Sequence, residues 1–357
     1  MKFTLPATLD SYRLLGKSGL RVSPLCLGTM TFGKEWGWGS TPEEAKEIFD
    51  IYTEAGGNFF DTADFYTGGT SEKLLGKFIA SERERFVVAT KYSLSTRRGD
   101  PNAGGNHRKN MVQSVEASLR RLGTDYIDLY WLHVWDNTTP IDEIMRGLDD
   151  LVRAGKVLYI AISDTPAWQI ARMNTLAELR GLSRFIALQI EYNLVRRDAE
   201  RDLIPMAQEL GLGVLPWSPL AGGVLTGKYS MEDLKRQQTA APPATPFGQE
   251  RRLVKLTEKR LKVADTVKDI ASEIGRTPAQ VALNWLLLNP AVVSPIIGAR
   301  TPEQLKDNLA SLEFRLDQNQ IQRLEEVSAI EPGFPHDFLK GQFVQDFLSG
   351  GCKIIAG

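Results

Sequence analysis

Four residues of this sequence could together carry out acid–base chemistry. Asp61, Lys91 and His133 each close a short apolar run, and Tyr66 follows Asp61 by five residues. Neighbouring strands of a sheet lie less than about 5 Å apart, so side chains at their ends can meet. Taken singly, an Asp at such a position commonly caps a turn, a Lys is commonly solvated, and a His is commonly structural. Three ionisable ends on consecutive runs plus a nearby tyrosine are much less expected by chance, and we predict one shared site.

The chemistry that suits this set is proton donation to an oxygen that gains negative charge. A free tyrosine titrates near pH 10, roughly, too high for a good acid at neutral pH. The ammonium group of Lys91 is expected to lower the pKa of Tyr66, and Asp61 is expected to keep Lys91 charged. The imidazole of His133 could orient a carbonyl oxygen or share the proton. We interpret the set as a general acid directed at a developing alkoxide.

The elements that would position these residues follow from the apolar pattern. Continuous apolar runs are typical of parallel strands covered on both faces, and amphipathic segments separate them. Eight runs in one alternation predict an α/β fold, a single (β/α)8 TIM barrel, with chemistry at the C-terminal strand ends. A doubly wound sheet is the alternative, but the first run leads to residues 28–33, which do not spell GxGxxG. The predicted strands are residues 25–27, 58–61, 86–91, 127–133, 159–163, 187–191, 213–217 and 293–297, and the predicted helices are residues 41–55, 71–79, 108–122, 141–154, 166–182, 198–210 and 301–312.

Several segments lie outside this alternation or mark its boundaries. Capping boxes followed by proline predict helix starts at Thr41, Thr277 and Thr301. Three further segments do not fit the pattern: an N-terminal hairpin within residues 8–24 that could plug the barrel bottom, a long polar loop at residues 218–254 after the seventh strand, and a C-terminal tail from about residue 328 that could cover the mouth. We predict one domain over residues 1–357 with a core of about 12–328.

Composition excludes several classes of protein. Forty-three Lys and Arg balance 44 Asp and Glu, which removes the electrostatic case for a nucleic-acid partner. Two cysteines give no disulfide framework, so a cytoplasmic location is the default. The N-terminus has no apolar signal segment, and prolines interrupt the most apolar long stretch at residues 281–299, so we expect no membrane partner. The three histidines lack metal-ligand spacing, so we expect no metal site.

Six motifs, in order and well spaced, make the chain resemble the aldo-keto reductases over roughly residues 12–328. This resemblance implies a TIM barrel that binds a nicotinamide cofactor without a Rossmann domain. It also implies an Asp-Tyr-Lys-His tetrad, which falls on Asp61, Tyr66, Lys91 and His133. The motifs are LGTM at 27–30, FDTADFY at 60–66, ATK at 89–91, RLGTDYIDLY at 121–130 leading to His133, QIEYN at 189–193 and WSPLAGG at 217–223.

The resemblance also implies a set of cofactor contacts. Asp164 stands where many relatives have Asn, and an ionised carboxylate can accept but not donate a hydrogen bond. Trp217 stands where relatives commonly stack a tyrosine on the nicotinamide, and it can stack equally well. The implied contacts are Gly28, Thr29, Met30 and Asp61 near the nicotinamide ribose; Ser163, Asp164 and Gln189 at the carboxamide; Trp217 on the ring; Ser218, Leu220, Gly222, Leu225 and Lys228 around the pyrophosphate; and Gly298, Arg300, Gln304 and Asn308 at the adenosine phosphate.

Residues 297–301 give physical support for a phosphate site. They open a helix just after the eighth strand, a common position for phosphate in barrels. The planar fork of Arg300 suits a 2′-phosphate, so we favour NADP(H) over NAD. Residues 222–228 nearly spell a P-loop, but Tyr229 stands where Ser or Thr should bind magnesium, so we discard nucleotide hydrolysis.

Three readings of the function remain open. The first is an NADP-dependent aldo-keto reductase that reduces an aldehyde or ketone with Tyr66 as general acid. The second is a redox-sensing, cofactor-binding regulatory subunit that resembles potassium-channel β subunits, and the third reverses the enzyme to oxidise an alcohol. The oligomeric state stays open. Aromatic residues after the strands favour an apolar or planar carbonyl, or a sugar, as the small-molecule substrate: Phe32, Trp36, Trp38, Tyr92 and Trp135.

Overall fold

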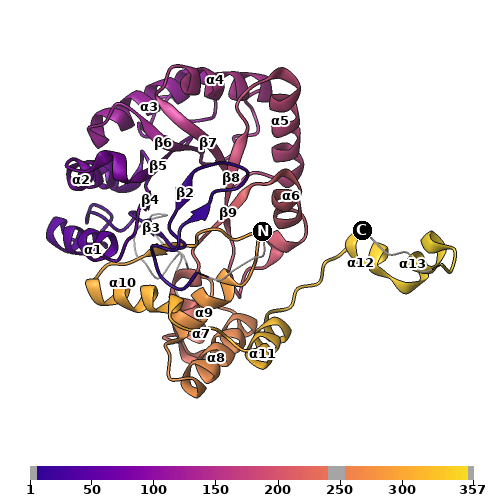
Figure 1. Ribbon diagram of the computed structural model, residues 1–357. Coiled ribbons are helices and arrows are strands. Elements are labelled where there is room, and N and C mark those ends of the chain that lie inside the picture. Colours follow the sequence, from indigo (N-terminus) through magenta and orange to yellow (C-terminus); the bar gives the residue numbers. More distant parts are fainter. Residues whose placement is uncertain (1–5, 240–253, 353–357) are drawn as a thin grey trace.

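Eight parallel strands form the centre of the molecule. The computed structural model describes residues 6–239 and 254–352. The strand order is β10-β3-β4-β5-β6-β7-β8-β9, and a parallel bridge between Val214 and Val292 brings the two ends of the sheet together. The sheet is therefore a nearly closed barrel inside a ring of helices (Figure 1), and the predicted (β/α)8 fold is confirmed. The strands are β3 (Cys26–Gly28), β4 (Phe59–Asp61), β5 (Val87–Tyr92), β6 (Ile127–Leu132), β7 (Val157–Ser163), β8 (Phe185–Glu191), β9 (Gly213–Trp217) and β10 (Ile296–Gly298).

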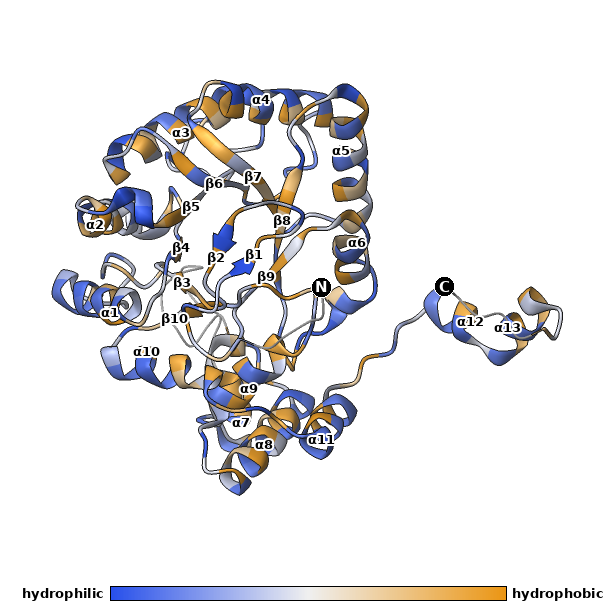
Figure 2. Ribbon diagram, in the orientation of Figure 1, coloured by the Kyte–Doolittle hydropathy of each residue, from blue (hydrophilic) through white to orange (hydrophobic). Residues whose placement is uncertain are grey.

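The helices between these strands follow the amphipathic pattern. On α3, Met111, Val115 and Leu119 are buried against the barrel, while Arg120 is exposed. Figure 2 shows the same division around the ring, with hydrophilic colour on outer helix faces and hydrophobic colour on the strands. The helices of the alternation are α1 (Pro42–Glu54), α2 (Thr70–Ile79), α3 (Arg108–Leu122), α4 (Ile141–Arg153), α5 (Ala167–Arg180), α6 (Leu203–Leu210) and α10 (Pro302–Leu309), and further helices are α7 (Met231–Thr239), α8 (Glu258–Glu273), α9 (Pro278–Leu287), α11 (Gln318–Ser328), α12 (His336–Lys340) and α13 (Gln342–Ser349).

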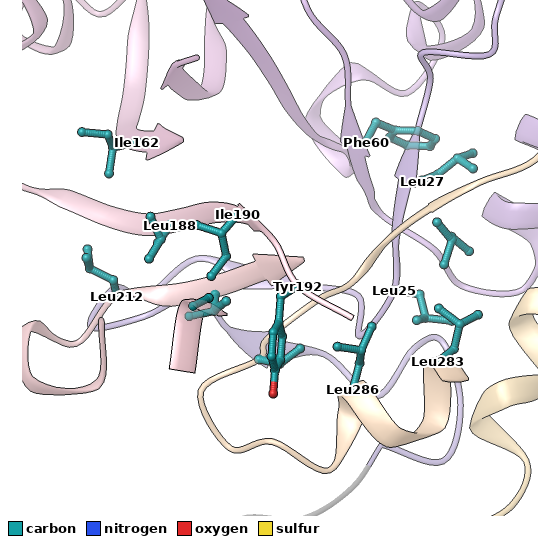
Figure 3. Packing of buried hydrophobic residues seen from close by; sticks show 14 of the residues in the cluster. Leu25, Leu27, Phe60, Ile162, Leu188, Ile190, Tyr192, Leu212, Leu283 and Leu286 are labelled. Carbon is teal, nitrogen blue, oxygen red and sulfur yellow. The ribbon is translucent and has the colours of Figure 1, made fainter. Parts of the chain in front are cut away.

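Alternate residues of each strand enter two separate cores. On β6, Leu129 and Trp131 point into the barrel, whereas Tyr130 and Leu132 pack against the helices. This follows from the period of two along a strand. Figure 3 shows part of the outer core, where strand residues such as Leu27 and Ile190 face Leu283 and Leu286 of α9. The inner core is smaller and lies within the closed sheet.

The predicted N-terminal hairpin is present and fills the bottom of the barrel. Strands β1 (Arg13–Leu14) and β2 (Arg21–Val22) pair antiparallel. Leu15 and Val22 are fully buried and belong to the inner core. Arg13 donates a hydrogen bond to the Val292 carbonyl at 2.6 Å. The barrel is thereby closed at its N-terminal end, and its chemistry must face the opposite end.

Two of the three predicted capping boxes are confirmed. Thr41 and Thr277 cap α1 and α9 with the reciprocal bonds of a complete box. Thr301 does accept from the Gln304 amide, but the Gln304 side chain accepts from the Arg300 amide at 2.9 Å. The box predicted at Thr301 is therefore wrong in its second bond, because that bond ties down the residue before the cap.

Two segments differ from their predicted irregular structure. The region predicted as a long loop after the seventh strand contains a 3-10 helix at residues 221–226 and helix α7, and its residues 240–253 lie outside the described residues. The tail contains α12 and α13, which extend away from the barrel instead of covering its mouth (Figure 1). Within the described ranges, no helix combines the length and the hydropathy that a membrane span requires.

Candidate active site

The four residues predicted to meet lie together at the C-terminal end of the barrel. The Lys91 ammonium lies 2.5 Å from a carboxylate oxygen of Asp61 and 3.1 Å from the Tyr66 hydroxyl. It also donates to the Thr62 carbonyl at 2.7 Å. His133 lies beside this group, with its ring centroid 6.2 Å from that of Tyr66. The predicted constellation is present because β4, β5 and β6 are consecutive neighbours in the sheet.

A strained turn brings Tyr66 back over Lys91. Tyr66 begins a 3-10 turn in which Thr67, Gly68 and Gly69 all have positive φ. Positive φ is unfavourable for threonine. Two hydrogen bonds hold Thr67 there, one from its hydroxyl to the Phe32 carbonyl at 2.9 Å and one from the Ser71 amide at 3.0 Å. The turn therefore fixes the position of the Tyr66 hydroxyl.

Burial and charge set the protonation of Tyr66 and Lys91. Burial raises the pKa of Tyr66 above its ordinary value, and the lowering by Lys91 only partly opposes this. The expectation of a net lowered tyrosine pKa is therefore wrong, because the phenol lies in the interior. Burial also works against a charged Lys91, but Asp61 and Tyr66 outweigh it and raise the pKa of the lysine. At neutral pH the site holds a protonated phenol beside an ammonium.

The histidine of the site is neutral. Burial, followed by the charge of Lys91, holds the pKa of His133 well below its ordinary value. Its Nδ1 atom is buried and makes no hydrogen bond to the described residues. A neutral imidazole keeps one N–H donor and one acceptor nitrogen. His133 can therefore orient a carbonyl oxygen without adding charge to the site.

A pair of buried carboxyl groups lies behind the tetrad, and this pair was assigned no role from the sequence. Asp64 and Glu72 are both buried, and Arg121 donates to Glu72 at 2.5 Å. Neither carboxyl oxygen of Asp64 makes a hydrogen bond to the described residues. Burial and the nearby Glu72 raise the pKa of Asp64 to about 8. The signal was present in the FDTADFY segment, where a second Asp precedes Tyr66 by two residues.

The residues expected at the nicotinamide surround the tetrad. Gln189 donates to Asp61 at 3.0 Å and so joins the group from the far side of the barrel. The Trp217 indole donates to Asp164 at 3.0 Å, so the Asp164 carboxylate acts there as a hydrogen-bond acceptor.

The remaining residues expected near the nicotinamide lie at or near strand ends. Thr29 is buried and bonds to Ser71 at 2.8 Å. A Cβ atom at Gly28 would lie 2.7 Å from the Ile296 side chain, so glycine is needed for strand packing there. Ser163 ends β7 nearby, and Met30 lies two residues beyond the end of β3.

The loop after β9 has the backbone of an anion cradle. Ser218, Ala221, Gly222 and Gly223 all have positive φ. Successive residues of this kind direct backbone N–H groups into a concavity that suits phosphate. The Lys228 ammonium lies over Gly223, within 2.8 Å of where a Cβ atom would stand. Leu220 is half-buried in this loop, whereas Leu225 is fully buried in the outer core, which leaves only its backbone for a ligand.

A second position that would suit a phosphate lies at the start of α10. Gly298 and Gln304 are exposed there, and Arg300 is half-buried. Asn308 is buried and donates to the Gly298 carbonyl at 3.3 Å. The cradle, the helix N-terminus and Trp217 together fit the phosphates and the ring of a nicotinamide dinucleotide. Among the described residues, no group of three or more His, Cys, Asp or Glu is placed to hold a metal ion.

The expected substrate residues separate into two groups. Trp36 is half-buried and packs on Trp38 and Tyr66, with centroids 5.8 and 6.3 Å away. Trp135 is also half-buried, and it meets an exposed Trp168 edge-on. By contrast, the structure places Phe32 and Tyr92 fully inside the outer core.

Sequence reasoning missed two aromatic residues near the site, Phe65 and Trp168. Phe65 packs on Tyr66 and His133, with centroids 5.1 and 5.6 Å away. Its signal was its place directly before Tyr66. Trp168 is 61% exposed at the start of α5. Its signal was a tryptophan in the first turn of a helix that follows a strand end.

Comparison with known proteins identifies similar chains. A family model described as the Aldo/keto reductase family matches residues 24–329. The norsolorinic acid reductase stcV of Emericella nidulans is 41% identical, over 94% of this chain and 86% of that protein. An aryl-alcohol dehydrogenase [NADP(+)] of Phanerodontia chrysosporium is 38% identical, over 93% and 89%. The aldo-keto reductase ausK of Emericella nidulans is also 38% identical, over 93% and 85%.

Proposed function

This chain belongs to the aldo/keto reductase family, and from that membership we propose that it reduces an aldehyde or ketone with NADPH, using Tyr66 as the general acid. The observation that carries the proposal is the contact of the Tyr66 hydroxyl with Lys91 at 3.1 Å, while Lys91 is held by Asp61. The raised pKa of Tyr66 keeps the phenol protonated and able to donate.

Each residue of the tetrad has a separate task in this proposal. The nicotinamide cofactor, when bound, supplies the hydride that reaches the carbonyl carbon. Tyr66 gives its hydroxyl proton to the carbonyl oxygen as negative charge develops there, and the product is an alcohol. Lys91 stabilises the phenolate that remains. Asp61 holds Lys91 in place, and neutral His133 orients the oxygen.

The preference for NADPH rests on residues that suit its phosphates. The positive-φ loop from Ser218 to Gly223 and the first turn of α10 offer backbone donors to anions. Arg300 lies beside that turn and offers a planar fork to a 2′-phosphate. The NADP(+) in the name of the Phanerodontia relative supports the same choice.

The proposed substrate is an aromatic carbonyl compound, and the reverse oxidation of an aryl alcohol would use the same residues. Trp36, Trp38 and Trp135 lie at or near the mouth and can stack on planar rings. Relatives named as norsolorinic acid reductases and an aryl-alcohol dehydrogenase support this class. A cytoplasmic location is part of the proposal, and the two free cysteines, Cys26 and Cys352, suit it.

Tyr66→Phe tests the proposed acid. We expect the variant to bind NADPH normally, measured by quenching of tryptophan fluorescence. We expect kcat for aryl aldehydes and ketones to fall by about 10²–10⁴-fold, because no proton reaches the oxygen. Binding and turnover would be compared with NADH in parallel.

Tyr12→Phe is the matched control, since Tyr12 bonds to the Gly56 carbonyl beside the N-terminal hairpin, away from the mouth. Full turnover by Tyr66→Phe would rule out this residue as the acid. Tight NADPH binding by the parent protein without turnover of any carbonyl would favour the regulatory reading instead.

A further inference from the structure

The C-terminal arm, defined as residues 332–352, is the feature that the proposed activity leaves unexplained. The arm contains α12 and α13 and stands apart from the barrel (Figure 1). Polar groups hold its root: Arg201 donates to the Glu331 carbonyl at 2.7 Å, and His336 meets Asp202 at 3.2 Å. A cleft of about 490 Å³ lies between the root and the residues around Arg197 and Pro205, and both charged and apolar residues line it. The phenylalanines of the arm stay exposed, so the barrel does not bury the arm in an apolar seat.

The arm exposes several large apolar side chains. Its phenylalanines occur in pairs four residues apart, which places Phe343 and Phe347 on one side of α13. Phe334 lies in the turn before α12 and packs on Phe338 of that helix. The centroids of Phe343 and Phe347 lie 4.6 Å apart, and those of Phe334 and Phe338 lie 6.2 Å apart. Figure 2 shows hydrophobic colour on both helices. The exposed fractions are 85% for Phe334, 57% for Phe338, 49% for Leu339, 71% for Phe343, 75% for Phe347 and 69% for Leu348.

Such an exposed apolar surface is not stable in water by itself. Isolated helices shorter than about 12 residues are marginal, and α12 and α13 have 5 and 8 residues. At the stated exposures, the six side chains leave on the order of 700 Å² of apolar surface in water, since one large aromatic residue can bury about 150–250 Å². Exposed apolar surface of this extent on one short segment marks an interaction surface.

We propose that the occupant of this surface is the arm of a second copy of the chain. The available area is close to the roughly 800 Å² that each partner contributes to a stable interface. A twofold axis can bring the same face of two copies together, so that no other complementary surface is required. The arm carries Asp337, Lys340 and Asp346, a nearly balanced set that opposes self-association little. Two arms form a four-helix cluster with the phenylalanines inside.

The oligomeric state of the whole protein tests this proposal. Sedimentation equilibrium of the parent chain at micromolar concentration is expected to give about twice the 39.8 kDa of one chain. The double variant F343S/F347S is expected to weaken the dimer by 100-fold or more. The matched control L158S/L179S removes two exposed leucines of the barrel and should remain dimeric.

Cys352 reports whether the arms themselves meet. It is exposed at the end of the arm, whereas Cys26 is fully buried, so a thiol dye labels one position. Mixing donor-labelled and acceptor-labelled parent protein should give energy transfer that F343S/F347S abolishes. Turnover should survive in the variant, because the tetrad lies in the barrel, and lost turnover with an intact dimer would count against the proposed function alone.

Three results would overturn the arm pairing. One is a monomeric parent protein at tens of micromolar, whether or not it binds lipid vesicles. Another is a dimer that F343S/F347S leaves intact. The third is a dimer without energy transfer between Cys352 labels, which would place the arm on the partner's barrel instead.

Discussion

Tyr66 and Lys91 show how one buried environment can keep an acid neutral and a base charged. Burial favours the neutral form of both side chains. For Tyr66 that preference prevails and preserves the proton to be donated. For Lys91 the carboxylate at 2.5 Å reverses it. Sequence spacing could predict the meeting of these residues, but not this balance, because the depth of each atom is fixed only in three dimensions.

Deprotonation of Asp64 should lower the free energy of unfolding as the pH rises. Burial, followed by the charge of Glu72, raises the pKa of the Asp64 carboxyl to about 8 in the folded protein, whereas the pKa of an unfolded aspartate is about 4. Between these values the folded state binds the extra proton, so the free energy of unfolding falls as pH rises. Asp64→Asn removes this penalty. The thermal midpoint of the variant minus that of the parent protein should therefore increase by roughly 2 °C or more from pH 5 to pH 8.

The matched control is Asp125→Asn, which changes an exposed carboxylate. Its thermal midpoint should keep the pH dependence of the parent protein. Calorimetry at several pH values would measure both variants. An unchanged pH slope in Asp64→Asn would mean that the Asp64 carboxyl is already ionised in the folded state.

Among the elements, the strands and the tetrad were predictable from sequence, whereas the surroundings of the site were only partly so. Asp61, Lys91 and His133 follow apolar runs, and parallel strands place their ends together. Phe32 and Tyr92 also follow or end such runs, yet both turn into the outer core. Tyr92 ends β5, and because its neighbour Lys91 faces the barrel interior, the period of two turns Tyr92 outward. Phe32 lies in a loop, where the pattern of residue types does not give the direction of a side chain, which depends on neighbours such as Phe78.

Two helices outside the alternation were also missed, although both carry start signals. Helix α11 begins with a complete capping box formed by Asp317 and Gln320, and Thr257 caps α8 with its side chain. The two helices pack on one another outside the barrel. The alternation of strands and helices gave no reason to place a further helix in either segment, and these cap signals were not used.

The hairpin depends on one glycine, which gives a prediction at the level of this element. Gly16 has φ +58°, and a Cβ atom there would lie 2.2 Å from the Ile186 carbonyl oxygen and 2.6 Å from that of Gly211. Gly16→Ala should therefore lower the free energy of unfolding by about 1–3 kcal/mol. Urea denaturation followed by tryptophan fluorescence would measure the loss.

Gly19 provides the comparison within the same turn. A Cβ atom at Gly19 would meet nothing within 4 Å. Gly19→Ala should therefore leave the urea midpoint nearly unchanged. An equal decrease in the free energy of unfolding in the two variants would show that the hairpin does not pack tightly around Gly16.

For the whole molecule, the active site and the arm are separate. All four residues of the tetrad come from one barrel, and the arm extends away from it. Turnover per chain should therefore stay constant, within about 2-fold, as dilution dissociates the proposed dimer. Activity measured from nanomolar to micromolar enzyme would check this. A steep loss on dilution would mean that a partner copy completes the site.

The hairpin plug also constrains when the chain can finish folding during its synthesis. Arg13 bonds to a carbonyl 279 residues further along, and β3 pairs with β10. The first residues of the barrel must therefore wait until nearly all of the others have left the ribosome. Contacts of such high sequence separation slow folding and leave apolar surface exposed meanwhile. The nascent chain should accordingly require chaperone protection for most of its translation, and release of the last barrel strand should be the event that ends it.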